Sequence, residues 1–159
     1  MAMEIETRTV TVAHRAYEAV RDYRERMGKE LPVWKRSPYT EMTYVEIKRL
    51  LSLPKLILSP EKTHAKWVQW CIKDGWVLGD KLDPEKKIHP RLIPFCAQTN
   101  EDKMITDIIL SVFRHHRKWL YEAMNITEDE IDCPDLFASG SSGISIARVE
   151  HINTINQGF

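Results

Sequence analysis

The chain has 159 residues, a length typical of a single domain that buries a core without metal ions or disulfides. Acidic and basic residues balance at 23 each, so the basic excess that bulk electrostatic binding of nucleic acid needs is missing. The three cysteines are an odd number without close spacing, and the first residues, MAMEIETRTV, lack the features of a secretory signal. No apolar run is long enough to span a bilayer. We therefore expect a cytoplasmic protein and do not expect it to bind membranes or nucleic acid.

The first part of the chain is predicted to form a strand and two helices. Residues 4–10 alternate weakly between apolar and polar types, which is compatible with an edge strand. Over residues 12–27, apolar residues recur at helical spacing and predict the first helix. Thr43 and Glu46 fit a capping box, in which each residue satisfies a backbone N–H of the other. They predict the start of a second helix, which Pro54 ends.

The third helix is marked at both ends by residues with special backbone roles. Ser59 suits the N-cap position and Pro60 the first helical position. Gly75 suits the left-handed residue that follows a helix. His64 and Trp67 then lie one turn apart on a single face of this helix.

An irregular segment with short elements follows the third helix. Asp83 and Pro84 resemble a cap that opens a single helical turn. His89 ends that turn, because a residue that precedes proline avoids the helical region. Residues 91–95 are apolar and extended, consistent with a short strand or a buried crossing.

The fourth helix is predicted from about residue 100 to residue 121. Its expected buried stripe consists of Ile105, Ile108, Ile109, Val112, His116, Trp119 and Leu120. The composition changes after the helix, where an acidic segment precedes a flexible Gly/Ser spacer at residues 139–143. The residues after the spacer could form a strand or an arm that becomes ordered on a partner.

Several motifs occur in a fixed order between residues 59 and 121. They are His64-x-x-Trp67, the segment GWVLG at 75–79, Asp83, and the segment KIHPRLIPF at 87–95. In order and spacing they resemble the ryanodine-receptor repeat domain, or RyR domain. The consensus of that family contains His-x-x-Trp, Gly-Trp-x-Tyr-Gly, an Asp-containing turn and Lys-x-His-Pro-x-Leu-Val-Pro-Tyr. Two positions depart from it: Leu78 replaces the usual Tyr, and Thr106 stands where the family tends to carry Asp.

The resemblance implies a small, mostly α domain of about four helices with short β-strands. We expect this domain to span residues 1–124, with its core motif at 59–121, and an acidic loop and C-terminal arm to follow at 125–159. The resemblance also implies a regulatory or ligand-binding module that is not an enzyme. Family members are associated with nucleotides, an adenine-type base lying against aromatic side chains. Stand-alone members occur in bacteria and their phages, which implies a bacterial or phage-infected cytoplasm for this chain.

The residues themselves are compatible with such a binding site. Trp67 and Trp76 offer flat π surfaces, and one stacked base contributes about 1–3 kcal/mol. Lys87 and Arg91 flank His89 and supply donors for phosphate groups. We expect a ligand face made of six side chains, in which the two histidines fix the geometry: Trp67, Trp76, Lys87, Arg91, His64 and His89.

Each of these residues also has a purely structural interpretation, which the sequence leaves open. Trp67 on a helical stripe is often part of a core, and Trp76 beside a glycine is often the apolar contact of a helix C-terminus. Histidines more often hold loops through hydrogen bonds than contact ligands. Lysine and arginine in this segment could form a solvated face.

Enzymatic and metal-dependent functions have weaker support. The sequence contains no phosphate-binding glycine loop, no Gly-x-Ser-x-Gly and no HExxH motif. Histidine and cysteine are numerous, but they lack the spacing of a zinc site. We therefore expect no catalytic residues, metal or cofactor. The second hypothesis is an assembly subunit, in which the RyR motif is a scaffold and the arm at 139–159 forms a homo-oligomer.

Overall fold

The computed structural model describes residues 2–37, 39–53 and 59–126. Within these ranges the chain forms four α-helices and two short strands, which confirms the predicted mostly α fold. The predicted C-terminal arm at 139–159 lies outside the described residues. None of the described helices combines the length and apolar character that crossing a membrane requires. The chain divides into two compact units, Met1–Leu58 with Ile108–Phe159, and Ser59–Asp107.

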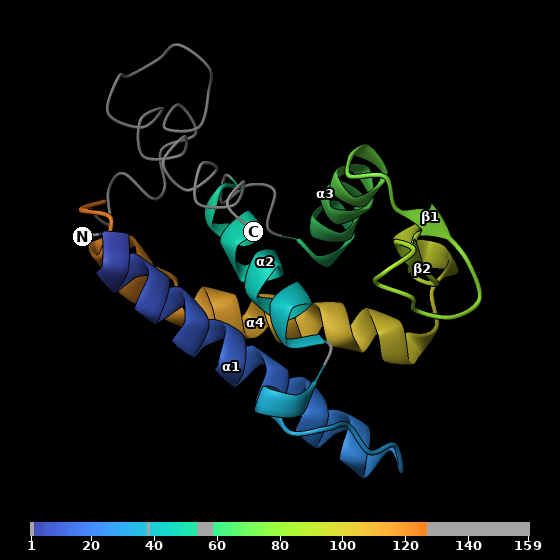
Figure 1. The fold of residues 1–159 in the computed structure, drawn as a ribbon. Coiled ribbons are helices and arrows are strands. Elements are labelled where there is room, and N and C mark those ends of the chain that lie inside the picture. Colours follow the sequence, from blue (N-terminus) through green and yellow to red (C-terminus); the bar gives the residue numbers. More distant parts are fainter. Residues whose placement is uncertain (1, 38, 54–58, 127–159) are drawn as a thin grey trace. The chain divides into compact units, whose positions relative to one another are not determined.

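The first unit contains α1 (Ala2–Arg26), η1 (Trp34–Arg36), α2 (Tyr39–Leu51) and the greater part of α4 (Asn100–Glu122). Helices α1 and α2 lie side by side (Figure 1). The residues of the apolar core cluster come from three helices and the turn after α4: Ile5, Val12, Ala13, Ala16, Tyr44, Ile47, Leu50, Leu51, Leu110, Phe113, Leu120, Tyr121, Ala123, Met124 and Ile126. Burial of this apolar surface is the main source of stability for the unit.

The predicted edge strand at residues 4–10 is wrong, because this segment belongs to α1. Ile5, Thr9 and Val12 are buried at helical spacing. The Thr9 hydroxyl donates to the carbonyl oxygen of Ile5 over 2.6 Å and is thereby satisfied inside the core. A polar residue type at a buried position concealed the helical period from the sequence.

The predicted capping box at Thr43 and Glu46 is also wrong, because α2 begins at Tyr39. The hydroxyl of Thr43 donates to the carbonyl oxygen of Tyr39 over 2.8 Å, inside the helix. Glu46 pairs with Arg49 in the next turn, with Oε1 2.7 Å from Nη2. The N-terminal acceptor is the hydroxyl of Ser37, 3.1 Å from the backbone nitrogen of Tyr39.

The loop before α2 is anchored by Trp34. Its ring stacks on His14 of α1 at a centroid distance of 5.1 Å. The edge of Tyr17 packs against the same ring at 5.4 Å, and the Tyr17 hydroxyl donates to the carbonyl oxygen of Pro32. Two turns of α1 therefore hold both the ring and the backbone of this loop.

Helices α1 and α4 run antiparallel in the first unit, because Arg8 contacts Trp119 while Arg15 contacts His116. The guanidinium of Arg8 lies 5.0 Å from the centroid of the Trp119 ring and donates to the Trp119 carbonyl. The predicted stripe of α4 is correct at Ile105 and Leu120 but shifted elsewhere. The fully buried residues include Leu110 and Phe113, whereas five predicted positions are only half-buried: Ile108, Ile109, Val112, His116 and Trp119.

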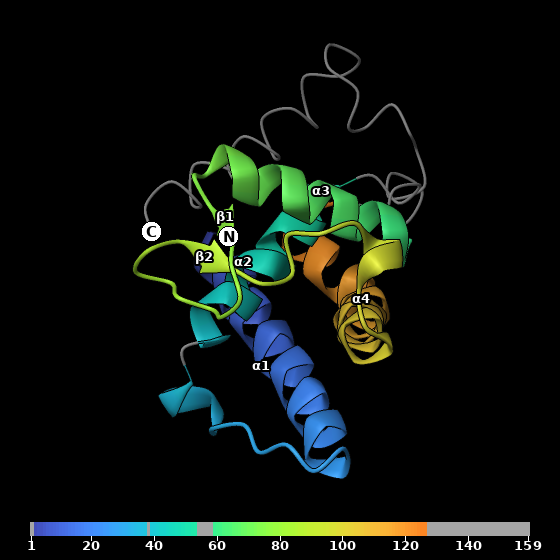
Figure 2. The ribbon, with the colours of Figure 1, turned by 90° about the vertical axis from the view of Figure 1, so that its right-hand side faces the viewer.

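The second unit contains α3 (Pro60–Lys73), β1 (Val77–Leu78), β2 (Ile88–His89), η3 (Phe95–Ala97) and the first turns of α4 (Figure 2). Both ends of α3 match the prediction. The Ser59 hydroxyl accepts from the backbone N–H of Lys62 over 3.3 Å, and Gly75 has a φ of +90°. The N–H of Trp76 bonds to the carbonyl of Cys71 over 2.9 Å, which completes a Schellman motif.

The strands β1 and β2 are parallel, with Val77 paired to Ile88. Ile88 also forms an antiparallel bridge with Asp83, through two backbone hydrogen bonds of 2.9 Å. The residues between them form a turn instead of the predicted helical turn, although Asp83 does cap it by accepting from the N–H of Lys86. Residues 91–95 do not form a strand, because Pro90 and Pro94 lack the N–H groups that a ladder needs.

Candidate functional site

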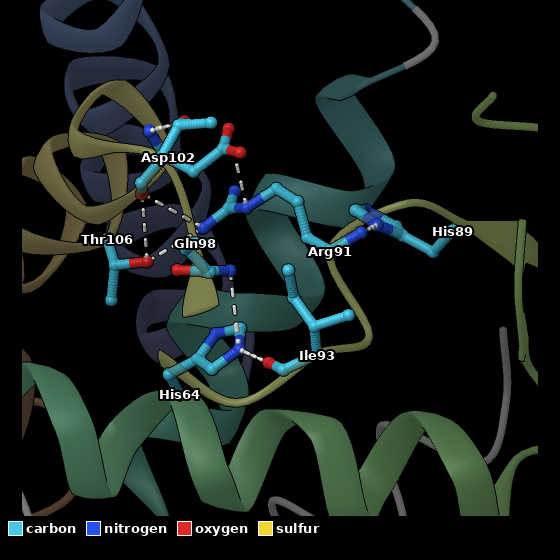
Figure 3. A network of polar contacts seen from close by, with 8 residues as sticks. His64, His89, Arg91, Ile93, Gln98, Asp102 and Thr106 are labelled. Atoms are coloured by element: carbon cyan, nitrogen blue, oxygen red, sulfur yellow. Dashed lines mark hydrogen bonds and ion pairs between the residues drawn. The ribbon is translucent and has the colours of Figure 1, made fainter. Parts of the chain in front are cut away.

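All six predicted site residues lie in the second unit. His64 and Trp67 belong to α3, and Trp76 directly follows its C-terminus. The other three come from the turn, from β2 and from the loop after it: Lys87, His89 and Arg91. Figure 3 shows the polar part of this region, including His64, His89 and Arg91. The structure brings together aromatic and basic residues from four segments.

Trp67 is the centre of the aromatic cluster. Its ring centroid lies 4.8 Å from that of His89, which meets it edge-on, and 5.4 Å from that of His64. The guanidinium carbon of Arg91 lies 5.9 Å from the centroid of the Trp67 ring, within cation–π range. Trp67 is half-buried, so part of its surface is used for packing and part is accessible to solvent.

His89 is buried and neutral. Its Nδ1 accepts the backbone N–H of Arg91 over 3.1 Å, so the ring proton is on Nε2 (Figure 3). Burial, and after it the nearby charge of Arg91, lower the pKa of His89 from 6.5 to about 4, although the carboxylate of Asp102 acts in the opposite direction. His89 therefore fixes the backbone of the turn that carries Arg91, as the structural interpretation of this residue predicted.

His64 has a similar role on α3. Its Nε2 lies 2.7 Å from the carbonyl oxygen of Ile93 (Figure 3). Because a carbonyl only accepts, Nε2 carries the proton and donates it. The side-chain amide of Gln98 lies 3.3 Å from the same nitrogen, and both residues are buried. His64 thus holds the loop after β2 against α3.

Arg91 is held by the first turns of α4. Its Nη2 donates to the Thr106 hydroxyl over 2.7 Å and to the Asp102 carbonyl oxygen over 3.3 Å (Figure 3). Its Nε lies 3.9 Å from Oδ1 of Asp102. Thr106, the position where the family tends to carry Asp, therefore accepts a hydrogen bond, and the negative charge comes from Asp102. Sequence reasoning missed Asp102, which lies four residues before Thr106 on the same helix face.

Lys87 and Trp76 share Asp74 as a partner. The ammonium of Lys87 lies 2.7 Å from the main-chain oxygen of Asp74 and 3.3 Å from its Oδ2. The indole N–H of Trp76 donates to the same Oδ2 over 3.2 Å. The side chains of Lys87 and Asp74 are 46% and 47% exposed, so this part of the cluster borders on solvent. Sequence reasoning missed Asp74, whose position beside Gly75 at the helix end was the available signal.

The chemistry that these residues offer is recognition. Two indoles supply apolar π surface, and an exposed ammonium lies at its border. The carboxylates of Asp74 and Asp102 each pair with a cation and not with one another. Within the described residues, no three His, Cys, Asp or Glu side chains gather where they could hold a metal ion.

A family model described as the RyR domain matches residues 40–125, which is more than half of the chain. The chain belongs to the RyR domain family. The match includes all six candidate residues, and it extends upstream of the quoted motifs to α2. Neither the search of curated proteins nor the search of solved structures gave a match.

Proposed function

We propose that this RyR domain is a non-enzymatic binding module for a nucleotide or a nucleotide-derived signal. The observation that supports this function is the aromatic cluster of Trp67, Trp76 and His89, with the ammonium of Lys87 at its exposed border. A purine ring needs a flat apolar surface, and a phosphate needs a cation beside it. The cluster supplies both within one unit of the chain.

Four of the six ligand-face residues are proposed to contribute to binding, to different degrees. Trp76 and Lys87 border on solvent and are the proposed direct contacts for base and phosphate. Trp67 packs against His89, and Arg91 is engaged by Asp102 and Thr106. Arg91 therefore positions the cluster and reaches a ligand only by giving up these partners.

The expected affinity sets the conditions for a test. One stacked base contributes about 1–3 kcal/mol, and a phosphate on an exposed ammonium adds at most about 1 kcal/mol. Together they amount to at most about 4 kcal/mol, which is a Kd of about 1 mM or weaker unless further contacts form on binding. Binding assays therefore need ligand concentrations in the millimolar range.

The test is thermal unfolding with adenosine diphosphate, ADP-ribose and a cyclic dinucleotide. We expect at least one of them to raise the melting temperature, because a ligand that binds only the folded state stabilises it. The double variant Trp67→Ala, Trp76→Ala should lose this shift. Trp70→Ala is the matched control, because Trp70 is an exposed tryptophan of α3 outside the ring contacts. Folded protein that responds to no member of the panel would refute the proposal.

A second measurement tests the non-enzymatic part. The ligand that raises the melting temperature is incubated with the protein and then analysed by mass spectrometry. Recovery of the unchanged ligand is the expected result. Conversion that requires Trp67 and Trp76 would show that the cluster is an active site.

A further inference from the structure

Asp74 connects the two side chains that border on solvent. Its Oδ2 lies 3.2 Å from the indole nitrogen of Trp76 and 3.3 Å from the ammonium of Lys87. Oδ2 is thus an anionic oxygen that lies beside an aromatic ring and on a cation. This is the arrangement that the proposed function requires of a ligand phosphate.

Lys87 has a second anchor that does not depend on this carboxylate. Its ammonium is 2.7 Å from the main-chain oxygen of Asp74, which is closer than the side-chain oxygen. The main-chain oxygen belongs to the C-terminus of α3, where helices favour a cation. The ammonium therefore keeps its position when the carboxylate turns away.

We propose that the Asp74 carboxylate occupies the position on Lys87 that a ligand phosphate takes, so that binding exchanges one anion for the other. This inference rests on the proposed function. It names Asp74 as the residue that determines how strongly the site distinguishes phosphate-bearing ligands from uncharged ones. A ligand phosphate gains the Lys87 contact only by displacing Asp74. An uncharged nucleoside has no such competition, because it needs only the ring of Trp76.

The variant Asp74→Asn removes the competition of the carboxylate for Lys87 while it keeps the contacts that position Trp76 and Lys87. Asparagine keeps an oxygen that accepts the Trp76 N–H, and the main-chain oxygen still holds Lys87. The negative charge on Lys87 is removed. Because an exposed ion pair contributes at most about 1 kcal/mol, phosphate-bearing ligands should bind up to about fivefold more tightly.

Titration calorimetry of the full chain with ADP, adenosine and inorganic pyrophosphate tests the exchange. Asp74→Asn should tighten the binding of ADP and pyrophosphate and leave that of adenosine unchanged. In a Lys87→Met background the same substitution should have no effect on binding, because the ammonium for which the carboxylate and the phosphate compete is absent. Asp80→Asn is the matched control, since it removes one charge from an exposed residue outside the Lys87 contacts.

The outcomes separate this inference from the proposed function. ADP binding that is equal in both proteins, or a gain that adenosine or Asp80→Asn shares, would overturn the exchange and leave the binding module intact. Tighter pyrophosphate binding by Asp74→Asn without any binding of ADP or adenosine would support the exchange and overturn ADP and adenosine as ligands of the aromatic cluster. Failure of all three ligands to bind either protein would overturn the exchange, and the binding module as well if ADP-ribose and the cyclic dinucleotide also leave the melting temperature unchanged.

Discussion

Lowering the pH from 7 to 5 should destabilise the second unit through His89. An unfolded chain binds a proton at this residue near pH 6.5, whereas the folded chain does so only near pH 4. Between these values the unfolded state holds more protons, so stability falls as the pH falls. The contribution of neutral His89 to the free energy of unfolding is fully present above pH 6.5 and is lost progressively as the pH falls towards 4.

The size of the loss follows from the same two values. The difference between 6.5 and about 4 corresponds to about 3 kcal/mol when the pH has fallen below both. At pH 5 most of the unfolded chains are protonated and few of the folded ones are, so the loss is about 2 kcal/mol. His89 is only 7% exposed, which is why burial has so large an effect on its pKa.

Urea unfolding at both pH values, followed by tryptophan fluorescence, measures the effect. In His89→Asn, the Asn oxygen can replace Nδ1 as the acceptor for the N–H of Arg91, but it does not titrate. The variant should lose about 2 kcal/mol less than the parent protein between pH 7 and pH 5. Equal losses in parent and His89→Asn, or a titration of His89 near pH 6.5 by NMR, would refute the reasoning.

Two further predictions concern packing, one in each unit. Gly79→Ala places a Cβ in steric overlap with the Cγ2 of Ile88, and this overlap should lower the free energy of unfolding in urea by about 1–3 kcal/mol. Adding Ile88→Ala should relieve part of this overlap. A double variant that is less stable than the sum of the single changes would contradict this account. Leu110→Ala should cost about 2–5 kcal/mol, and Ile108→Ala distinctly less, because Leu110 is fully buried and Ile108 is half-buried. Equal costs would show that the buried face of α4 is misassigned.

The ends of α3 could be predicted because their chemistry is local. Ser59, Pro60 and Gly75 each satisfy a backbone requirement within a few residues. The start of α2 could not be predicted in this way, since both Ser37 and Thr43 are suitable caps and only the structure distinguishes them. Local signals therefore fixed helix ends only where a single suitable residue was present.

The candidate site was predicted by residue type, but not by its pairings. The motif placed aromatic and basic residues in one segment, and the structure brings them together. Which acid pairs with which cation depends on tertiary contacts. Asp74 meets Lys87 across 13 residues and Asp102 meets Arg91 across 11, and no periodicity in the sequence relates these positions.

The double pairing of Ile88 has a consequence for how this surface can change. Parallel strands normally need a crossover of a dozen or more residues, whereas residues 79–87 connect β1 to β2 directly. The loop closes because Ile88 pairs with Val77 on one side and with Asp83 on the other. Most surface loops tolerate insertions, but an added residue between Asp83 and Ile88 would disrupt the turn that brings these two residues into register. The turn that carries Lys87 therefore has a constrained length, and its side chains can vary more freely than its backbone.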